Sequence, residues 1–125
     1  MTDQSRLFQA GPDPFGRMWN VQFRWLQTGI SIRHADTVDV KFFATPEGGQ
    51  AEEKVIALPH PALLEITSTR GRKLTDSYCL RLAAAHLRHM VETLEDIDKT
   101  LVTLTPQEVS AYDQQLIGVT VPQPA

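Results

Sequence analysis

Residues 18–27 read Met-Trp-Asn-Val-Gln-Phe-Arg-Trp-Leu-Gln, and their alternation decides the fold class. On one side of an extended chain fall Trp19, Val21, Phe23 and Trp25. Polar residues fall on the other side as far as Arg24. A period of two residues is typical of a β-strand with one buried face. We therefore expect a strand here, with its aromatic side chains in the core.

Three further strands are predicted downstream. Thr28-Gly29 interrupts the alternation, and residues 30–33 resume it as a short strand. Residues 38–43 alternate again, and residues 51–58 end in a four-residue apolar run. The strongest turn signal is Pro46-Glu47-Gly48-Gly49. Loops this short join antiparallel neighbours, so the sequence predicts a four-stranded antiparallel meander.

Helices are predicted after residue 59. Pro61 suits the first helical position, so a short apolar helix should begin at His60 and end at the segment Arg70-Gly71-Arg72-Lys73. Thr75 or Asp76 can then cap a longer helix.

The longer helix has one broad apolar face. Residues 80–94, placed at about 100° per residue, carry on this face Leu80, Ala83, Ala84, Leu87, Met90, Val91 and Leu94. Roughly opposite lie Tyr78, Leu82 and His89, which are free for a second contact with the chain's own tail or with a partner. We expect the helix to end near Thr93, because the acidic residues that follow oppose its dipole.

The C-terminal part holds one open question and one clear signal. Residues 100–104 are rich in β-branched types and could be a fifth strand, and a continuing helix is the alternative. Thr105-Pro106-Gln107-Glu108 is a capping box with proline at the first helical position. The helix that it starts is expected to run to about Leu116, with Gly118 just past its end.

These elements predict an α+β domain. The chain has 125 residues and a mass of 14.0 kDa, which suits one domain. We expect a flexible N-terminal arm over 1–17, a single domain over 18–117 and a C-terminal tail over 118–125. The domain would contain a meander of four strands, or five, followed by helices packed on one face.

Charge and composition narrow the partners. The net charge is −3 and the pI about 5.7, so general attraction to nucleic acid or an anionic membrane is not favoured. The strand aromatics are needed for the core, so nucleic-acid stacking is not expected either. No run of about 18 apolar residues indicates a membrane span. The single Cys79 forms no internal disulfide and no secretory signal is visible, so a cytoplasmic location is expected.

Charge is also polarised along the chain. Residues 66–91 hold five basic groups and one acidic group, whereas residues 92–125 hold one basic group and six acidic groups. Solvated helix faces of opposite sign are the simple interpretation. A head-to-tail or two-fold contact between two copies is the sharper one.

The single cysteine and the histidines are the candidate residues for a metal or nucleophile site. His86 and His89 form His-x-x-His, Cys79 precedes His86 by seven residues, and His60 is a further candidate ligand. Structural zinc usually takes four ligands at recognisable spacings, and Cys-x-x-Cys is missing, so no metal is predicted. Seven helical residues span about 10 Å, which excludes a Cys79–His86 dyad.

The segment between the two helices is the candidate ligand site. Arg70, Arg72 and Lys73 with a flexible glycine before a helix would favour phosphate or carboxylate. Asp76 puts a carboxylate where the anion would bind, and the Walker spacing is missing.

The sequence supports three functional hypotheses, in this order. The first is a small non-enzymatic interaction module that binds itself or another protein, with interface residues Phe43, Tyr78 and Leu82. The second is an anion- or phosphoester-binding domain, for a nucleotide-like effector, that uses Arg70, Arg72 and Lys73. The third is a metal-assisted enzyme built on Cys79, His86 and His89. No cofactor is expected.

Overall fold

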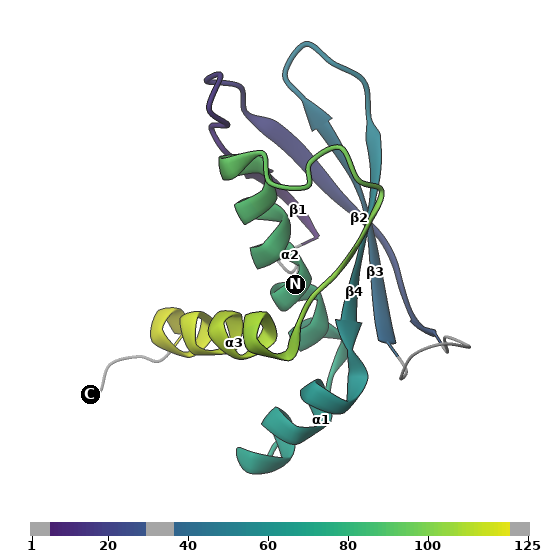
Figure 1. The fold of residues 1–125 in the computed structure, drawn as a ribbon, viewed down its shortest axis with the longest axis vertical. Coiled ribbons are helices and arrows are strands. Elements are labelled where there is room, and N and C mark those ends of the chain that lie inside the picture. The colour runs from purple at the N-terminus through teal and green to yellow at the C-terminus, as the bar shows by residue number, and fades with distance from the viewer. Residues whose placement is uncertain (1–5, 30–36, 121–125) are drawn as a thin grey trace.

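The structure is a computed structural model, and it describes residues 6–29 and 37–120. In chain order its elements are β1 (Leu7–Ala10), β2 (Trp19–Gly29), β3 (Thr37–Pro46), β4 (Glu52–Pro59), α1 (His60–Thr69), α2 (Asp76–Thr93), β5 (Leu101–Thr103) and α3 (Pro106–Thr120). The strands form one sheet in the order β1-β2-β3-β4-β5, and the helices lie on one side of it (Figure 1). The predicted α+β class is confirmed. Among the described helices, none has the length and apolar character needed to cross a membrane.

The sheet is a meander with one parallel addition. Strands β1 to β4 pair antiparallel with their neighbours in chain order. Strand β5 pairs with β4 in parallel, with Ile56 opposite Val102. A parallel pair needs a long crossover, which α1 and α2 supply. Residues 101–103 are therefore a strand, which resolves the question that the sequence left open.

The N-terminal stretch is more ordered than predicted. Residues 7–10 form β1, and Ala10 is buried beside its partner Trp19. In the turn that follows, the buried carboxylate of Asp13 accepts hydrogen bonds from the indole N–H of Trp19 at 3.0 Å and the backbone N–H of Arg17 at 2.9 Å. Where the sequence predicted a flexible arm, residues 7–10 pair with β2 and Asp13 joins the following turn to the core.

Strand β2 runs further than predicted. Thr28 pairs with Val38 and Gly29 pairs with Thr37, so Thr28-Gly29 continues the strand. The predicted strand over residues 30–33 lies outside the described residues.

A β-bulge changes the faces of β2. The register with β3 shifts between Phe23 and Trp25, which adds one residue to β2 at Arg24. Such an insertion turns every later side chain to the other face. Trp19 and Val21 are buried as predicted, but Trp25 is 38% exposed on the outer face and Leu26 packs against the core. The prediction that Trp25 is buried is therefore wrong.

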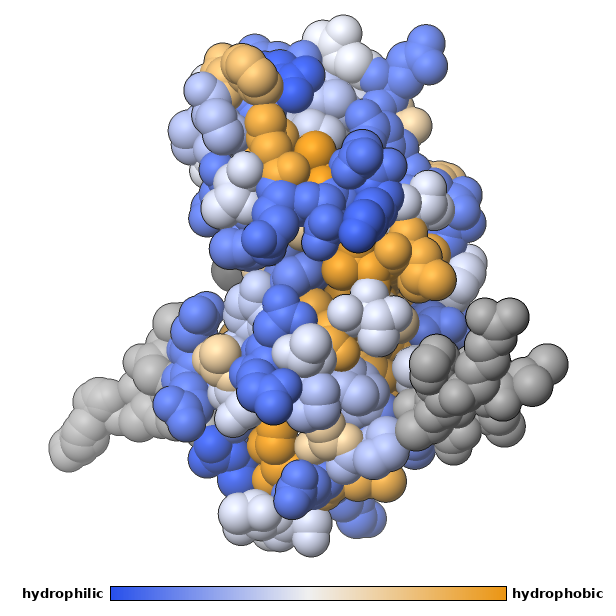
Figure 2. All heavy atoms as spheres, in the orientation of Figure 1, coloured by the Kyte–Doolittle hydropathy of each residue, from blue (hydrophilic) through white to orange (hydrophobic). Residues whose placement is uncertain are grey.

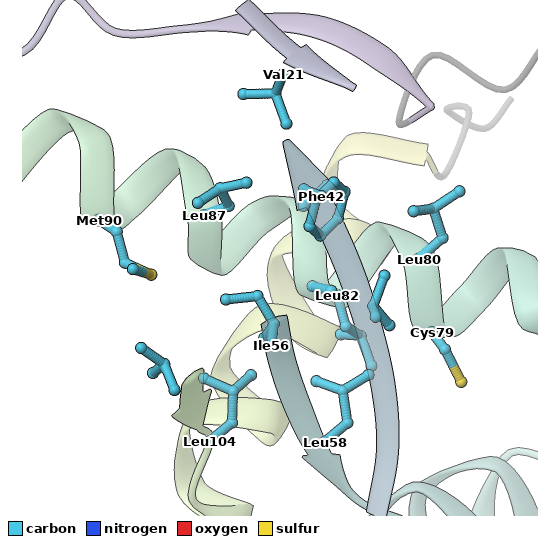
Figure 3. Packing of buried hydrophobic residues seen from close by; sticks show 14 of the residues in the cluster. Val21, Phe42, Ile56, Leu58, Cys79, Leu80, Leu82, Leu87, Met90 and Leu104 are labelled. Carbon is cyan, nitrogen blue, oxygen red and sulfur yellow. The ribbon is translucent and has the colours of Figure 1, made fainter. Parts of the chain in front are cut away.

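Helix α2 packs across β1 to β4 and is buried on two sides. Figure 3 shows Leu82 and Leu87 near Phe42, Ile56 and Leu58. Leu82 is fully buried, so its predicted role as a spare interface residue is wrong. The prediction assumed one covering surface, whereas α3 supplies a second one against the side that the sequence left unpartnered.

The helix boundaries follow local hydrogen bonding. Thr75 caps α2 by accepting from the backbone N–H of Tyr78 at 3.1 Å, and α2 ends at Thr93 as predicted. The capping box is confirmed: the N–H of Thr105 donates to Oε1 of Glu108 at 2.9 Å, and the N–H of Glu108 donates to Oγ1 of Thr105 at 3.1 Å. Helix α3 continues to Thr120, past the predicted end.

A buried lysine joins the chain before β5 to the sheet. Lys54 is 2% exposed on the inner face of β4. Its ammonium donates to the carbonyls of Ile97 and Lys99, the latter at 3.0 Å, and lies 3.3 Å from a carboxylate oxygen of Glu52. These bonds satisfy the buried charge, as burial requires, and hold the segment after α2 against the sheet.

Candidate functional site

A cavity of about 220 Å³ lies between the end of α1, the start of α2 and α3. Its wall contains the basic side chains of Arg70, Arg72, Lys73 and Arg81. The first three are the predicted ligand residues, and the structure brings them to one cavity. Arg81 was not among the predicted ligand residues, because its proximity to the α1–α2 segment depends on how the helices converge.

A Schellman motif turns the chain at the end of α1 and places these cations. The N–H of Gly71 donates to the carbonyl of Ser68 at 3.0 Å, and the N–H of Arg72 donates to that of Thr67 at 2.8 Å. Gly71 has φ of 67°, a left-handed conformation that glycine adopts without strain. The reversal directs Arg72 and Lys73 toward the start of α2.

A buried carboxylate organises one wall. Asp113 of α3 is 4% exposed, and its two oxygens accept from Nη2 of Arg70 at 2.6 Å and the hydroxyl of Tyr78 at 2.7 Å. Burial, followed by the hydrogen bond to Asp113, raises the pKa of Tyr78. The ion pair with Asp113 compensates most of the positive charge of Arg70. The sequence had placed Asp113 only in the acidic stretch; here the acidic and basic stretches meet within one chain.

The remaining wall combines positive charge with apolar surface. Among the described residues, Arg72, Lys73 and Arg81 form no ion pair. Asp76, which weakened the sequence argument, is absent from the described wall. Apolar surface comes from Ile66, Leu116 and the ring of Tyr78, and hydroxyl groups come from Thr67, Thr75 and Ser77.

In the described part of the chain, Cys79, His86 and His89 do not form a reactive cluster. Cys79 is buried, and burial raises the pKa of its thiol to about 12, so it stays protonated at neutral pH. His86 is 2% exposed, burial lowers its pKa, and its Nδ1 lies 2.8 Å from the hydroxyl of Tyr112. The exposed Nε2 of His89 lies 3.1 Å from Glu95. Within the described ranges, no three metal-ligating side chains come together.

The outer face of the sheet is the second candidate surface. Facing residues of β2, β3, β4 and β5 form one row across it: Trp25, Lys41, Val55 and Leu101. Trp25 is 38% and Leu101 57% exposed. On the side of the molecule turned to the viewer in Figure 2, by comparison, hydrophilic residues break the hydrophobic surface into separate patches.

Aromatic rings on this outer face lie beside cations. The half-buried Phe43, a predicted interface residue, alternates with the buried Phe42 and lies on the outer face. The guanidinium of Arg24 lies 5.1 Å from its ring centre, and Nζ of Lys41 lies 5.6 Å from the ring centres of both Phe43 and Trp25. Tyr78, the third predicted interface residue, instead contacts α3 inside the chain.

Comparisons with known proteins identify no relative. No model of a known protein family, no curated protein and no solved structure matches the chain. Function must therefore be inferred from the chemistry of the two surfaces described above.

Proposed function

We propose that this protein is a small interaction module that self-associates through the outer face of its sheet. The carrying observation is the row Trp25, Lys41, Val55 and Leu101, which exposes a tryptophan and a leucine on a face that no described helix covers. Removing apolar surface from water stabilises association by about 25 cal/mol per Å² before the costs of binding. Aromatic residues contribute strongly at the centre of interfaces.

The sheet edges support association less well than the face does. The edge strands β1 and β5 contain four and three residues. Short edge strands offer few unpaired backbone groups to an incoming strand. Face-to-face packing, with sheets about 10 Å apart, is the geometry that the outer surface favours.

The charges of this face suit a second copy of the chain. Arg24 and Lys41 supply two positive charges, and Asp39 and Glu53 supply two negative charges. A two-fold axis places the same patch on both sides of the interface. Lys41 and Glu53 pair within one chain at 3.1 Å, and the four charges sum to zero. Two copies of this patch therefore do not repel each other, as two patches of one sign would.

Measurement of mass in solution tests the proposal. Light scattering should give a mass above 14.0 kDa that rises with concentration, toward twice that value for a dimer. Trp25→Glu should return the protein to a monomer, because it buries a charge in the interface. Phe15→Glu is the matched control, since Phe15 is 75% exposed in the β1–β2 turn and lies off the sheet face. A wild-type monomer at about 1 mM, where even an association free energy of about −4 kcal/mol would show, contradicts the proposal.

Tryptophan fluorescence gives a second measurement of the same event. Trp19 is already only 2% exposed in the single chain, whereas Trp25 is 38% exposed on the proposed interface. Dilution should shift the emission to longer wavelength as Trp25 becomes hydrated. Trp25→Phe keeps an aromatic ring there and should abolish the shift. A shift that survives in this variant would assign the change to Trp19 and contradict the proposed face.

A further inference from the structure

We infer that the cavity between α1, α2 and α3 binds a small organic phosphate, with its phosphoryl group at Arg72, Lys73 and Arg81 and its apolar part against Ile66 and Leu116. This site is separate from the sheet face, because its wall comes from the helical layer and the α1–α2 segment. The inference therefore stands independently of self-association.

Charge balance favours an anion with two negative charges. The wall holds four basic groups and one acidic group, Asp113. Asp113 already accepts from Arg70 at 2.6 Å, which leaves Arg72, Lys73 and Arg81 to interact with a ligand. Like charges gathered around a cavity repel one another, and a bound anion relieves that repulsion. A phosphomonoester carries about −1.5 to −2 at pH 7 and matches three cations better than a monocarboxylate does.

The side-chain types also fit a phosphoryl group. The arginine guanidinium is a planar fork that can donate two parallel hydrogen bonds to phosphate oxygens, while lysine acts as a compact charge. Arg72 comes from the α1–α2 segment and Arg81 from α2, so donors approach from two elements. Hydroxyl groups of Thr75 and Ser77 add polar surface to the same wall.

Asp113 limits where the phosphoryl group can sit. Its carboxylate accepts hydrogen bonds from the guanidinium of Arg70 and the hydroxyl of Tyr78, and the residue is only 4% exposed. Its charge repels an anion from that part of the wall. Arg70 is therefore a positioning residue that joins α1 to α3, and the ligand uses the other three cations.

Volume and apolar surface describe the remainder of the ligand. About 220 Å³ lies below the roughly 300–1,000 Å³ common for drug-sized ligands, so the molecule is small. Ile66 and Leu116 offer apolar surface that free phosphate would leave in contact with water. A phosphate ester with one small apolar group covers both parts of the wall, and phenyl phosphate is a suitable probe.

Calorimetry with three probes tests the ligand class. Phenyl phosphate should bind more tightly than inorganic phosphate, which lacks the apolar group, and phenol, which lacks the charge, should not bind. Binding should weaken with added salt, because it rests on charge. Equal affinity for phenyl phosphate and inorganic phosphate would overturn the organic part of the inference, and no binding of phenyl phosphate would overturn it entirely.

Charge-removing variants test the location. Arg72→Gln and Arg81→Gln should each weaken the binding of phenyl phosphate at least about tenfold, since each removes charge-assisted hydrogen bonds to the phosphoryl oxygens. Lys99→Gln is the control, because it removes an exposed charge that pairs with Asp96 away from the cavity. Circular dichroism should show that all three variants stay folded. Equal loss in the control, or no loss in the two arginine variants, would overturn the assignment of the site.

Discussion

Phe42 and Phe43 are neighbours in β3, yet they lie in opposite environments. Phe42 is fully buried on the inner face, where the rings of Phe8 and Phe23 meet it edge-on with centres 6.4 and 6.2 Å away. Phe43 lies on the outer face beside the charged groups of Arg24 and Lys41. The two side chains are identical, and their environments differ because the helices cover only the inner face of the sheet.

The same contrast holds for two lysines. Lys54 is 2% exposed on the inner face and donates to backbone carbonyls, whereas Lys41 lies on the outer face with its Nζ 3.1 Å from Glu53. The helices and the segment after α2 cover the inner-face groups and contact them. The outer face offers similar residues to solvent, and this makes it available for a partner. Substitutions at matched positions on the two faces can therefore separate structural from interaction roles.

The largest difference is expected between the two phenylalanines. Phe42→Ala should lower the free energy of unfolding by about 3–5 kcal/mol, because it leaves a cavity in the core. Phe43→Ala should lower it by about 1 kcal/mol or less and should weaken self-association. Urea denaturation of dilute protein measures the first effect and light scattering the second. Equal losses of stability would show that the outer face is also structural.

The lysines should show the next largest difference. Lys54→Met keeps the apolar stem but removes the buried ammonium that donates to the carbonyls of Ile97 and Lys99. We expect a loss of about 1–3 kcal/mol in the free energy of unfolding. Lys41→Met removes a surface ion pair and should cost about 1 kcal/mol or less. Urea denaturation of the two variants side by side tests this order, and a larger loss for Lys41→Met would reverse it.

The stability of the fold should depend on pH through Asp13, which lies in the turn between β1 and β2. Burial raises the pKa of Asp13, but hydrogen bonds from Trp19, Arg17 and Phe15 outweigh it and lower the value to about 2. Because its pKa is lower in the folded state than the unfolded-state pKa of 3.8, the ionised carboxylate of Asp13 stabilises the fold above pH 3.8. This contribution is lost as the pH falls from about 4 to 2. Asp13→Asn should therefore be less stable than wild type at pH 7. Thermal melts should show the gap narrowing below pH 4, and a constant gap would contradict the charge-based explanation.

The smallest expected effect lies in the helical layer that covers the inner face. Thr105→Ala removes the cap that accepts from the N–H of Glu108. Loss of such a cap costs about 1 kcal/mol. Thr100→Ala is the control, because Thr100 is exposed outside any helix and should change the free energy of unfolding by no more than about 0.5 kcal/mol. Chemical denaturation compares the two variants, and equal values would show that the cap contributes nothing to stability.

Sequence reasoning succeeded where the signal is local. The alternation around Val38, Val40 and Phe42 predicted the buried side of β3, and the capping box at Thr105 placed the start of α3. Both patterns depend on residues within a few positions of one another. The predicted cations Arg70, Arg72 and Lys73 do line one cavity, but their pattern contained no information about Asp113, which lies about 40 residues away.

The failures come from contacts between distant residues. One extra residue at Arg24 moved Trp25 to the outer face of the sheet, and the alternating sequence pattern does not reveal such an insertion. Leu82 was assigned to a free surface because the helical wheel of α2 does not show that α3 packs against this helix, where it contacts Tyr78 and His86. Asp13 was placed in a flexible arm because its hydrogen bond with the indole of Trp19 depends on the turn that forms when β1 pairs with β2.

The amino-acid order by itself determined the α+β class, the types of β2, β3, β4 and the three helices, and most helix ends, because periodicity and capping act over one or two turns of chain. Tertiary structure alone decided which apolar side chains are covered, which cations share a cavity and which sheet face stays open. The physical reason is that burial is a property of surfaces brought together by the whole fold. A side chain's own sequence neighbours do not specify what will pack against it.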